Sequence, residues 1–176
     1  FAVEKLGNHD PKGGLRGGKY SLFDAGTHVP FFVYWKGKIQ PVVSDAIVCQ
    51  MDLMASISSL LKRPLNGHFD SQNLLPAFMG DSKTGREDLI LEAQGKLAIR
   101  EGNWIMIPPY NGPERNETGN ELGNLPDFAL YNTANDEAQT TNIASQHPDI
   151  LEKIKSNFFE LTEGYYKAEV EEVQLQ

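Results

Sequence analysis

A glycine-rich stretch with one lysine constrains this chain more than any other feature. Residues 13–30 read GGLRGGKYSLFDAGTHVP, with four glycines and Lys19 inside the first seven positions. Glycine adopts positive φ at little steric cost and lets backbone N–H groups approach a ligand closely. A lysine ammonium adds a compact positive charge. The stretch therefore predicts a turn shaped around an anion such as phosphate or sulfate, with Lys19 holding it.

Two other interpretations of this stretch remain. Residues 13–19 satisfy the first seven positions of the nucleotide-binding motif GxxxxGK[ST]. Tyr20 stands where that motif needs a hydroxyl for magnesium, and a polar segment stands where it needs a buried strand. A nucleotide site is therefore disfavoured, whereas a surface loop without a ligand stays open.

The continuation of the stretch resembles a known family. Residues 17–30 are similar to the signature GxKxxxxEGGxRxP of type I, formylglycine-dependent sulfatases, which are arylsulfatase-like members of the alkaline phosphatase superfamily. Residues 31–39, 45–61 and 130–144 resemble later segments of that family. The resemblance covers nearly the whole chain and implies the C-terminal portion of a sulfatase. Asp24 and His28 replace the family's Glu and Arg, so the roles of those two positions are not carried over.

The resemblance implies hydrolysis of sulfate esters. It makes Lys19 the catalytic and sulfate-binding residue, and His9 and Arg16 further candidates for substrate binding. The family's formylglycine is made from a C/SxPxR motif, which this sequence lacks, and its calcium-binding Asp-Asn pair is expected before Phe1. We therefore expect a fragment that is inactive alone and binds no metal, from a parent protein that carries formylglycine and Ca²⁺. Cys49 lies in an apolar run and is expected to be a small buried residue.

Substrate class and location also follow from the resemblance. The expected substrate is a sulfated small molecule or a sulfated polysaccharide, and the expected location is periplasmic or secreted. A net charge of −8 argues against nucleic acid, and no apolar run approaches the roughly 20 residues of a membrane span. The oligomeric state stays undefined. Two alternatives remain: a fragment of a related phosphatase, or an accessory glycan-binding module that uses Trp35, Trp104 and Tyr110.

The turn-rich run GDSKTG at residues 80–85 divides the chain into two lobes. Residues 1–82 are predicted to be the incomplete C-terminal part of a catalytic α/β domain. Within them, residues 30–35 predict a buried strand, and residues 52–61 predict a helix capped by Asp52. A parallel sheet needs helices on both faces, so this lobe alone should expose apolar surface.

Residues 83–176 are predicted to form a smaller α+β subdomain of about four antiparallel strands on a long helix. The strands are expected at residues 89–93, 97–100, 104–107 and 128–131, with hairpin turns between the first three. The helix should begin at Pro148 and pack on the sheet through an apolar stripe of Ile150, Leu151, Ile154, Phe158, Leu161 and Tyr165. Residues 108–126 predict an exposed, mobile loop, and the last eight residues a frayed end.

Overall fold

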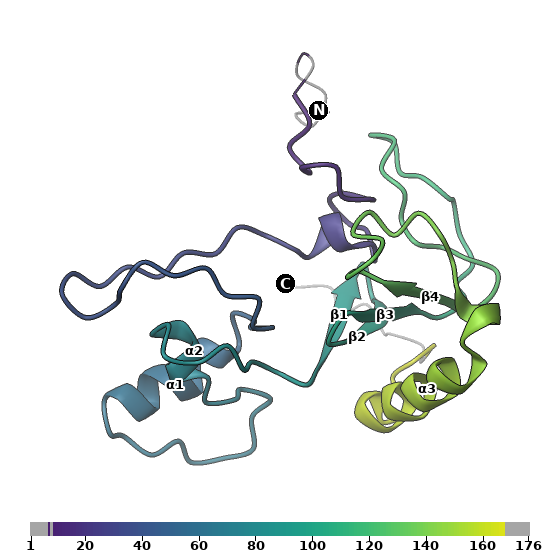
Figure 1. Cartoon of the computed structure of the whole chain (residues 1–176). Helices are drawn as coiled ribbons and strands as arrows, with labels where there is room; N and C mark the ends of the chain where they lie inside the picture. The colour runs from purple at the N-terminus through teal and green to yellow at the C-terminus, as the bar shows by residue number, and fades with distance from the viewer. Residues whose placement is uncertain (1–6, 8, 168–176) are drawn as a thin grey trace, which may run out of the picture. The chain divides into compact units, whose positions relative to one another are not determined.

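The computed structural model describes residue 7 and residues 9–167 (Figure 1). The chain forms two compact units. One comprises residues 30–89, and the other combines residues 9–29 with residues 90–167. This grouping differs from the predicted lobes, because Phe23 and Asp24 pack with the sheet. The end predicted to fray lies outside the described residues.

A four-stranded sheet forms the centre of the larger unit. Its strands follow one another in sequence order, as β1 (Asp88–Ala93), β2 (Lys96–Glu101), β3 (Trp104–Ile107) and β4 (Ala129–Asn132). β2 and β3 are antiparallel with Ile99 opposite Met106. β3 and β4 are antiparallel with Ile105 opposite Tyr131. The predicted antiparallel sheet is confirmed.

Turn chemistry fixes the first two hairpins. Gln94 and Gly95 join β1 to β2 with φ of 54° and 73°, and two consecutive positive φ values are what a type I′ turn requires. Gly102 begins the two-residue turn between β2 and β3 with φ of 55°. Both turns lie where the sequence predicts them.

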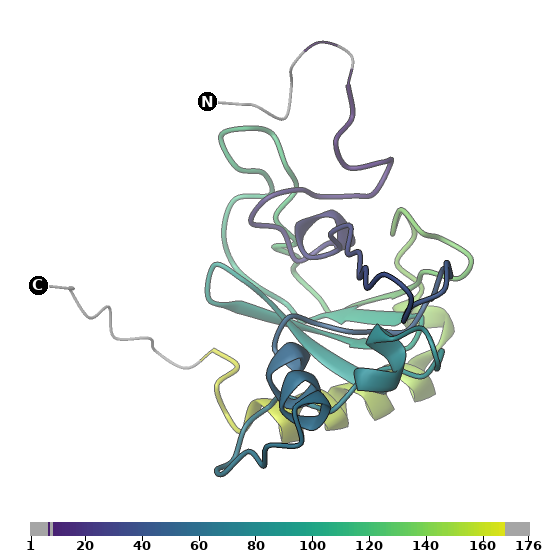
Figure 2. The same cartoon turned by 90° about the vertical axis from the view of Figure 1, so that its left-hand side faces the viewer.

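Helix α3 (Pro148–Thr162) covers one face of the sheet (Figures 1 and 2). Pro148 occupies the first turn, where its missing N–H would have no partner in the helix. The shared core contains apolar residues of three strands and the helix: Ile99, Met106, Leu130, Ile154 and Phe158. The predicted packing is confirmed, but the stripe is shorter than expected. The helix ends at Thr162, so Tyr165 lies beyond it and is 74% exposed.

The opposite face of the sheet is covered by the segment around a short 3₁₀ turn, η2 (Asp24–Gly26) (Figures 1 and 2). Leu22 and Phe23 are buried there. The ring of Phe23 lies 5.9 Å from that of Tyr131 in an edge-on contact. The sheet is thus a middle layer, and residues that follow Lys19 are part of its core.

The smaller unit contains two helices, α1 (Asp52–Leu60) and α2 (Leu75–Phe78). The predicted strand at residues 30–35 is wrong: these residues form no regular structure. Phe32 is 89% exposed and Tyr34 is 85% exposed. A strand needs a neighbouring strand for its backbone hydrogen bonds, and the described residues supply none here. The predicted exposed apolar surface is present.

Helix α1 buries polar residues. Asp52 and Ser56 are buried, whereas Ile57 and Leu60 are exposed. Asp52 is not the N-cap, because the helix begins with it and its carboxylate receives the Nε–H of Arg86 at 2.9 Å. Burial opposes ionisation of Asp52, but the Arg86 hydrogen bond, together with backbone N–H donors, holds its pKa below the usual value. A buried ion pair therefore takes the place of the predicted cap.

Candidate functional site

The turn that carries Lys19 has an unusual backbone. Gly17, Gly18 and Tyr20 have φ of 90°, 147° and 74°. The N–H of Ser21 donates to the carbonyl of Gly18 at 3.0 Å and closes the turn. Gly17 and Gly18 are buried, while Lys19 and Tyr20 are exposed. The turn therefore anchors its glycines in the protein and presents the lysine outward.

Close packing explains why glycine occupies both buried positions. A Cβ on Gly17 would lie 2.8 Å from the Cβ of Ser21, and a Cβ on Gly18 would lie 2.6 Å from the Cγ of Asn120. Neither approach is tolerable without movement. The positive φ predicted for these glycines is confirmed, and the atoms that crowd them belong to the protein.

The preceding glycines, Gly13 and Gly14, face open space. The carboxylate of Asp10 accepts the backbone N–H of Lys12 at 3.1 Å and that of Gly14 at 3.0 Å. These backbone hydrogen bonds lower the pKa of Asp10. The N–H of Gly14 is thus turned toward an internal anion.

The Lys19 ammonium is accessible. It lies 4.8 Å from the centroid of the Tyr20 ring, a distance at which a cation is attracted to an aromatic face. Among residues 7 and 9–167, no carboxylate lies within ion-pair distance of it. Its positive charge is therefore not neutralised by a neighbour in the described part of the chain.

The other two predicted site residues have different surroundings. Arg16 donates to Glu121 Oε2 at 2.6 Å and to the carbonyl of Gln139 at 2.8 Å. Its guanidinium also lies 3.9 Å from the centroid of the Phe23 ring. His9 is exposed. Arg16 lies on the same stretch as Lys19, but its side chain binds protein groups.

Glu121 is a residue that the sequence analysis missed. Its carboxylate lies between two guanidinium groups, because Arg115 also donates to it at 2.6 Å. Burial acts to raise the pKa of Glu121, but Arg16 and Arg115 outweigh burial and lower it. Glu121 follows Arg16 by 105 positions, and no local pattern marks such a pair.

Asp24 and His28, left without a role by the resemblance, lie in a second polar cluster. Asp24 is buried, and its carboxylate contacts His28 Nδ1 at 3.1 Å and receives an N–H of Arg100 at 3.3 Å. Its backbone N–H donates to Gln139 Oε1 at 2.7 Å. Asp24 therefore fixes the 3₁₀ turn to strand β2 and to the segment after β4.

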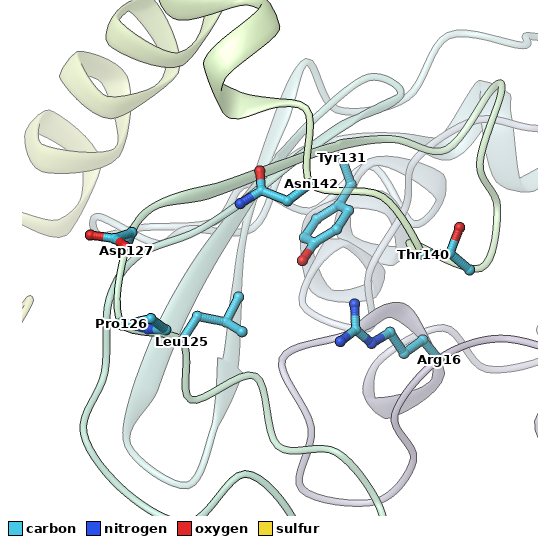
Figure 3. A pocket seen from close by; sticks show the side chains of 7 residues that line it. All are labelled: Arg16, Leu125, Pro126, Asp127, Tyr131, Thr140 and Asn142. Atoms are coloured by element: carbon cyan, nitrogen blue, oxygen red, sulfur yellow. The ribbon is translucent and has the colours of Figure 1, made fainter.

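A pocket of about 300 Å³ lies beside Arg16 (Figure 3). Figure 3 shows the guanidinium of Arg16 directed toward the hydroxyl of Tyr131. Burial raises the pKa of Tyr131, and the nearby charge of Arg16 opposes that effect. The remaining lining residues are Leu125, Pro126, Asp127, Thr140 and Asn142. Lys19 does not line this pocket, so the pocket is separate from the predicted anion site.

The described residues contain neither a metal-binding cluster nor a helix that could span a membrane. No group of three or more His, Cys, Asp or Glu is placed there to hold a metal ion. This part of the chain therefore does not fit the calcium site that the resemblance implies. None of the helices seen here has the length and apolar character of a membrane span.

Cys49 differs from its predicted role. It is only partly buried, and its Sγ lies 3.3 Å from Asp52 Oδ2. Burial raises the pKa of the Cys49 thiol, and the hydrogen bond to Asp52 adds to that effect. The thiol is a hydrogen-bonding neighbour of the Asp52–Arg86 pair.

The three candidate sugar-stacking aromatics have unequal exposure. Trp104 packs beside the core and its ring lies 5.4 Å from that of His147. The hydroxyl of Tyr110 donates to the carbonyl of Leu97 at 2.8 Å. Trp35 is 42% exposed. Only Trp35 presents a large free surface among the three.

Comparison with known proteins identifies the family. The sequence model of the family described as Sulfatase matches residues 4–62. An N-acetylgalactosamine-6-O-sulfatase of Bacteroides thetaiotaomicron is 38% identical over 157 residues, which are 87% of this chain and 31% of the relative. The chain belongs to the sulfatase family. Arylsulfatase A of Homo sapiens is 25% identical to it over 160 residues, 80% of this chain and 32% of the relative.

Solved structures agree with the family. A structure reported with the metabolism of multiple glycosaminoglycans by Bacteroides thetaiotaomicron superposes on this chain with a TM-score of 0.85 at 36% identity. The match covers 89% of this chain and 33% of that structure. A sulfatase from Pseudoalteromonas sp. shares the fold, with a TM-score of 0.67 at 18% identity. The match covers 92% of this chain and 34% of that structure. The predicted family and fold class are confirmed. The present chain spans about a third of the length of these relatives.

Proposed function

We propose that this chain is the sulfate-holding, C-terminal part of a sulfate ester hydrolase, with Lys19 as a catalytic residue. The observation that supports this most is the Lys19 turn. Its glycines are buried against the protein, and its lysine is exposed with no carboxylate in ion-pair distance among the described residues. An anionic sulfate group is the complement of such a cation.

Lys19 would act by stabilising negative charge. As the ester bond to sulfur breaks, charge grows on the sulfuryl oxygens and on the bridging oxygen. A fixed cation aimed at these atoms lowers the barrier without reorganising. Nucleophilic attack is the chemistry that a formylglycine supplies in this family, and we expect both it and Ca²⁺ outside the described residues. We expect the chain alone to be inactive.

The substrate class that we propose is a sulfated saccharide. A relative with 38% identity is named an N-acetylgalactosamine-6-O-sulfatase, and a matching structure is reported with glycosaminoglycan metabolism. A periplasmic or secreted location suits such a polymer. His9 is proposed as a further substrate contact because it is exposed. Arg16 could bind substrate directly only if its guanidinium shared its hydrogen bonds between the substrate and Glu121 and Gln139.

The test is Lys19→Ala in the longest natural protein that contains this chain, assayed on an aryl sulfate. We expect kcat/KM to fall about 100- to 1000-fold, the usual effect of losing one such donor. Lys12→Ala is the matched control, because Lys12 lies in the same segment outside the turn. Equal activity of the two variants would reject the assignment.

A non-catalytic, glycan-binding function is a second candidate, supported by the exposed rings of Tyr34 and Trp35. Sugars stack on such surfaces. In that case, Trp35→Ala should abolish glycan binding by the isolated chain, and Lys19→Ala should not affect it. A phosphatase parent would instead hydrolyse the phosphate ester of the same alcohol faster than the sulfate ester.

A further inference from the structure

We propose that Asn116 is a positioning residue for Lys19. Residues 114–122, here called the bracing turn, would hold the lysine's backbone in place. This inference rests on the proposed function of Lys19. It assigns a role to a segment that the sequence predicts only as an exposed, mobile loop.

The lysine turn needs support from outside. Three of its four residues, Gly17, Gly18 and Tyr20, have φ between 74° and 147°. For a tyrosine such a backbone costs on the order of 1–3 kcal/mol and persists only where surrounding structure enforces it. The turn's own closing bond is the single contact from Ser21 N to Gly18 O.

The bracing turn is itself well ordered by Asn116. The Oδ1 of Asn116 accepts hydrogen bonds from the N–H of Thr118 at 3.1 Å, the hydroxyl of Thr118 at 2.8 Å and the N–H of Asn120 at 2.9 Å. Arg115 and Glu121 pair across the base as an antiparallel bridge. The segment is thus a closed hairpin-like turn.

These bonds also orient the Asn116 amide. Because three donors face Oδ1, the Nδ2 group must point the other way, toward the carbonyl of Lys19, to which it donates at 3.4 Å. The bond is long. It nevertheless restrains the backbone of Lys19, the residue that carries the ammonium, directly.

Further contacts hold the two turns together on either side of Lys19. Before it, Arg16 binds Glu121 at 2.6 Å, and the side chain of Asn120 fills the space beside Gly18. After it, Leu22 N–H donates to the carbonyl of Leu122 at 3.1 Å. The lysine turn is therefore attached to the bracing turn at both ends, with Asn116 at its centre.

The test uses Asn116→Asp in the longest natural protein that contains this chain. A carboxylate has the same shape and keeps the acceptor for the three donors, but it cannot donate to Lys19. We expect kcat/KM to fall about 3- to 10-fold, the equivalent of one hydrogen bond, with the melting temperature nearly unchanged. Asn111→Asp is the matched control, since it makes the same substitution at an exposed residue of the same loop, outside the bracing turn. It should retain nearly full kcat/KM.

A double-mutant cycle separates positioning of Lys19 from a general structural role. If Asn116 acts through Lys19, adding Asn116→Asp to Lys19→Ala should cause no further loss. An additive loss, or native activity of Asn116→Asp while Lys19→Ala is impaired, would overturn the inference and leave the proposed function standing. Native activity of Lys19→Ala would instead reject the proposed function. If Asn116→Asp does not fold, the same double-mutant cycle can be measured with Asn116→Ser, because a serine side chain is too short to reach Lys19.

Discussion

At the scale of single residues, two glycines with nearly the same φ distinguish the cost of backbone strain from the cost of steric crowding. Gly17 and Gly14 have φ of 90° and 86°. A Cβ on Gly17 would lie 2.8 Å from Ser21 Cβ and 3.0 Å from Phe23 Cβ, whereas a Cβ on Gly14 meets nothing within 4 Å. Alanine at either position is strained, because a residue with a Cβ disfavours positive φ. Only Gly17→Ala also overpacks, so it should lower the free energy of unfolding by about 1–3 kcal/mol more than Gly14→Ala. Equal losses in urea denaturation would contradict the packing described here.

Sequence reasoning at this scale succeeds where the signal is local. The positive φ of Gly17 and Gly18 follows from a few adjacent residues. The partners of this turn do not. Glu121 and Asn116 come from segments 105 and 97 positions away from the residues that they contact. Neither has a pattern that distinguishes it from other polar loop residues.

At the scale of elements, the sheet and α3 are predictable because their turns and apolar spacing are local. The predictions that are wrong concern features that depend on residues distant in the sequence. Residues 30–35 have the composition of a strand, but pairing requires a neighbour that the described residues do not provide. Asp52 has the position of a cap, but Arg86, 34 residues away, takes its carboxylate. Tertiary partners override local propensity in both cases.

The Asp52–Arg86 pair should stabilise the smaller unit. The two side chains are 0% and 7% exposed, so Asp52→Asn would leave a buried guanidinium without its counter-charge. We expect a loss of about 3–5 kcal/mol in the unfolding free energy. Trp35 fluorescence in a Trp104→Phe background reports this unit. Exposed Asp45→Asn is the control and should change the stability little.

The same pair predicts an acid dependence. The pKa of Asp52 is lowered in the folded chain, so its stabilisation is present above the unfolded pKa of about 4 and is lost as pH falls through the folded value. The stability difference between the native chain and Asp52→Asn should therefore shrink on acidification below about pH 4. A difference that is constant down to pH 2 would refute it.

At the scale of the whole molecule, the apolar surface of the smaller unit is the dominant feature. Phe32, Tyr34 and Val43 are each more than 80% exposed, and exposed apolar area on this scale is typical of contact surfaces. We expect the isolated chain to bind a hydrophobic dye and a Phe32→Ser, Val43→Ser variant to bind less. Tyr165→Ser, in the other unit, should not reduce binding. Dye binding that is equally strong in all three proteins would place the patch elsewhere.

Lys19 is proposed to hold a sulfate group. The most direct measurement is a crystal structure of the longest natural protein that contains this chain, with a sulfate ester bound. We expect Lys19 Nζ to lie about 2.7–3.2 Å from a sulfate oxygen, a hydrogen-bond distance. A bound ester whose sulfate group lies beyond the reach of Lys19 would contradict it.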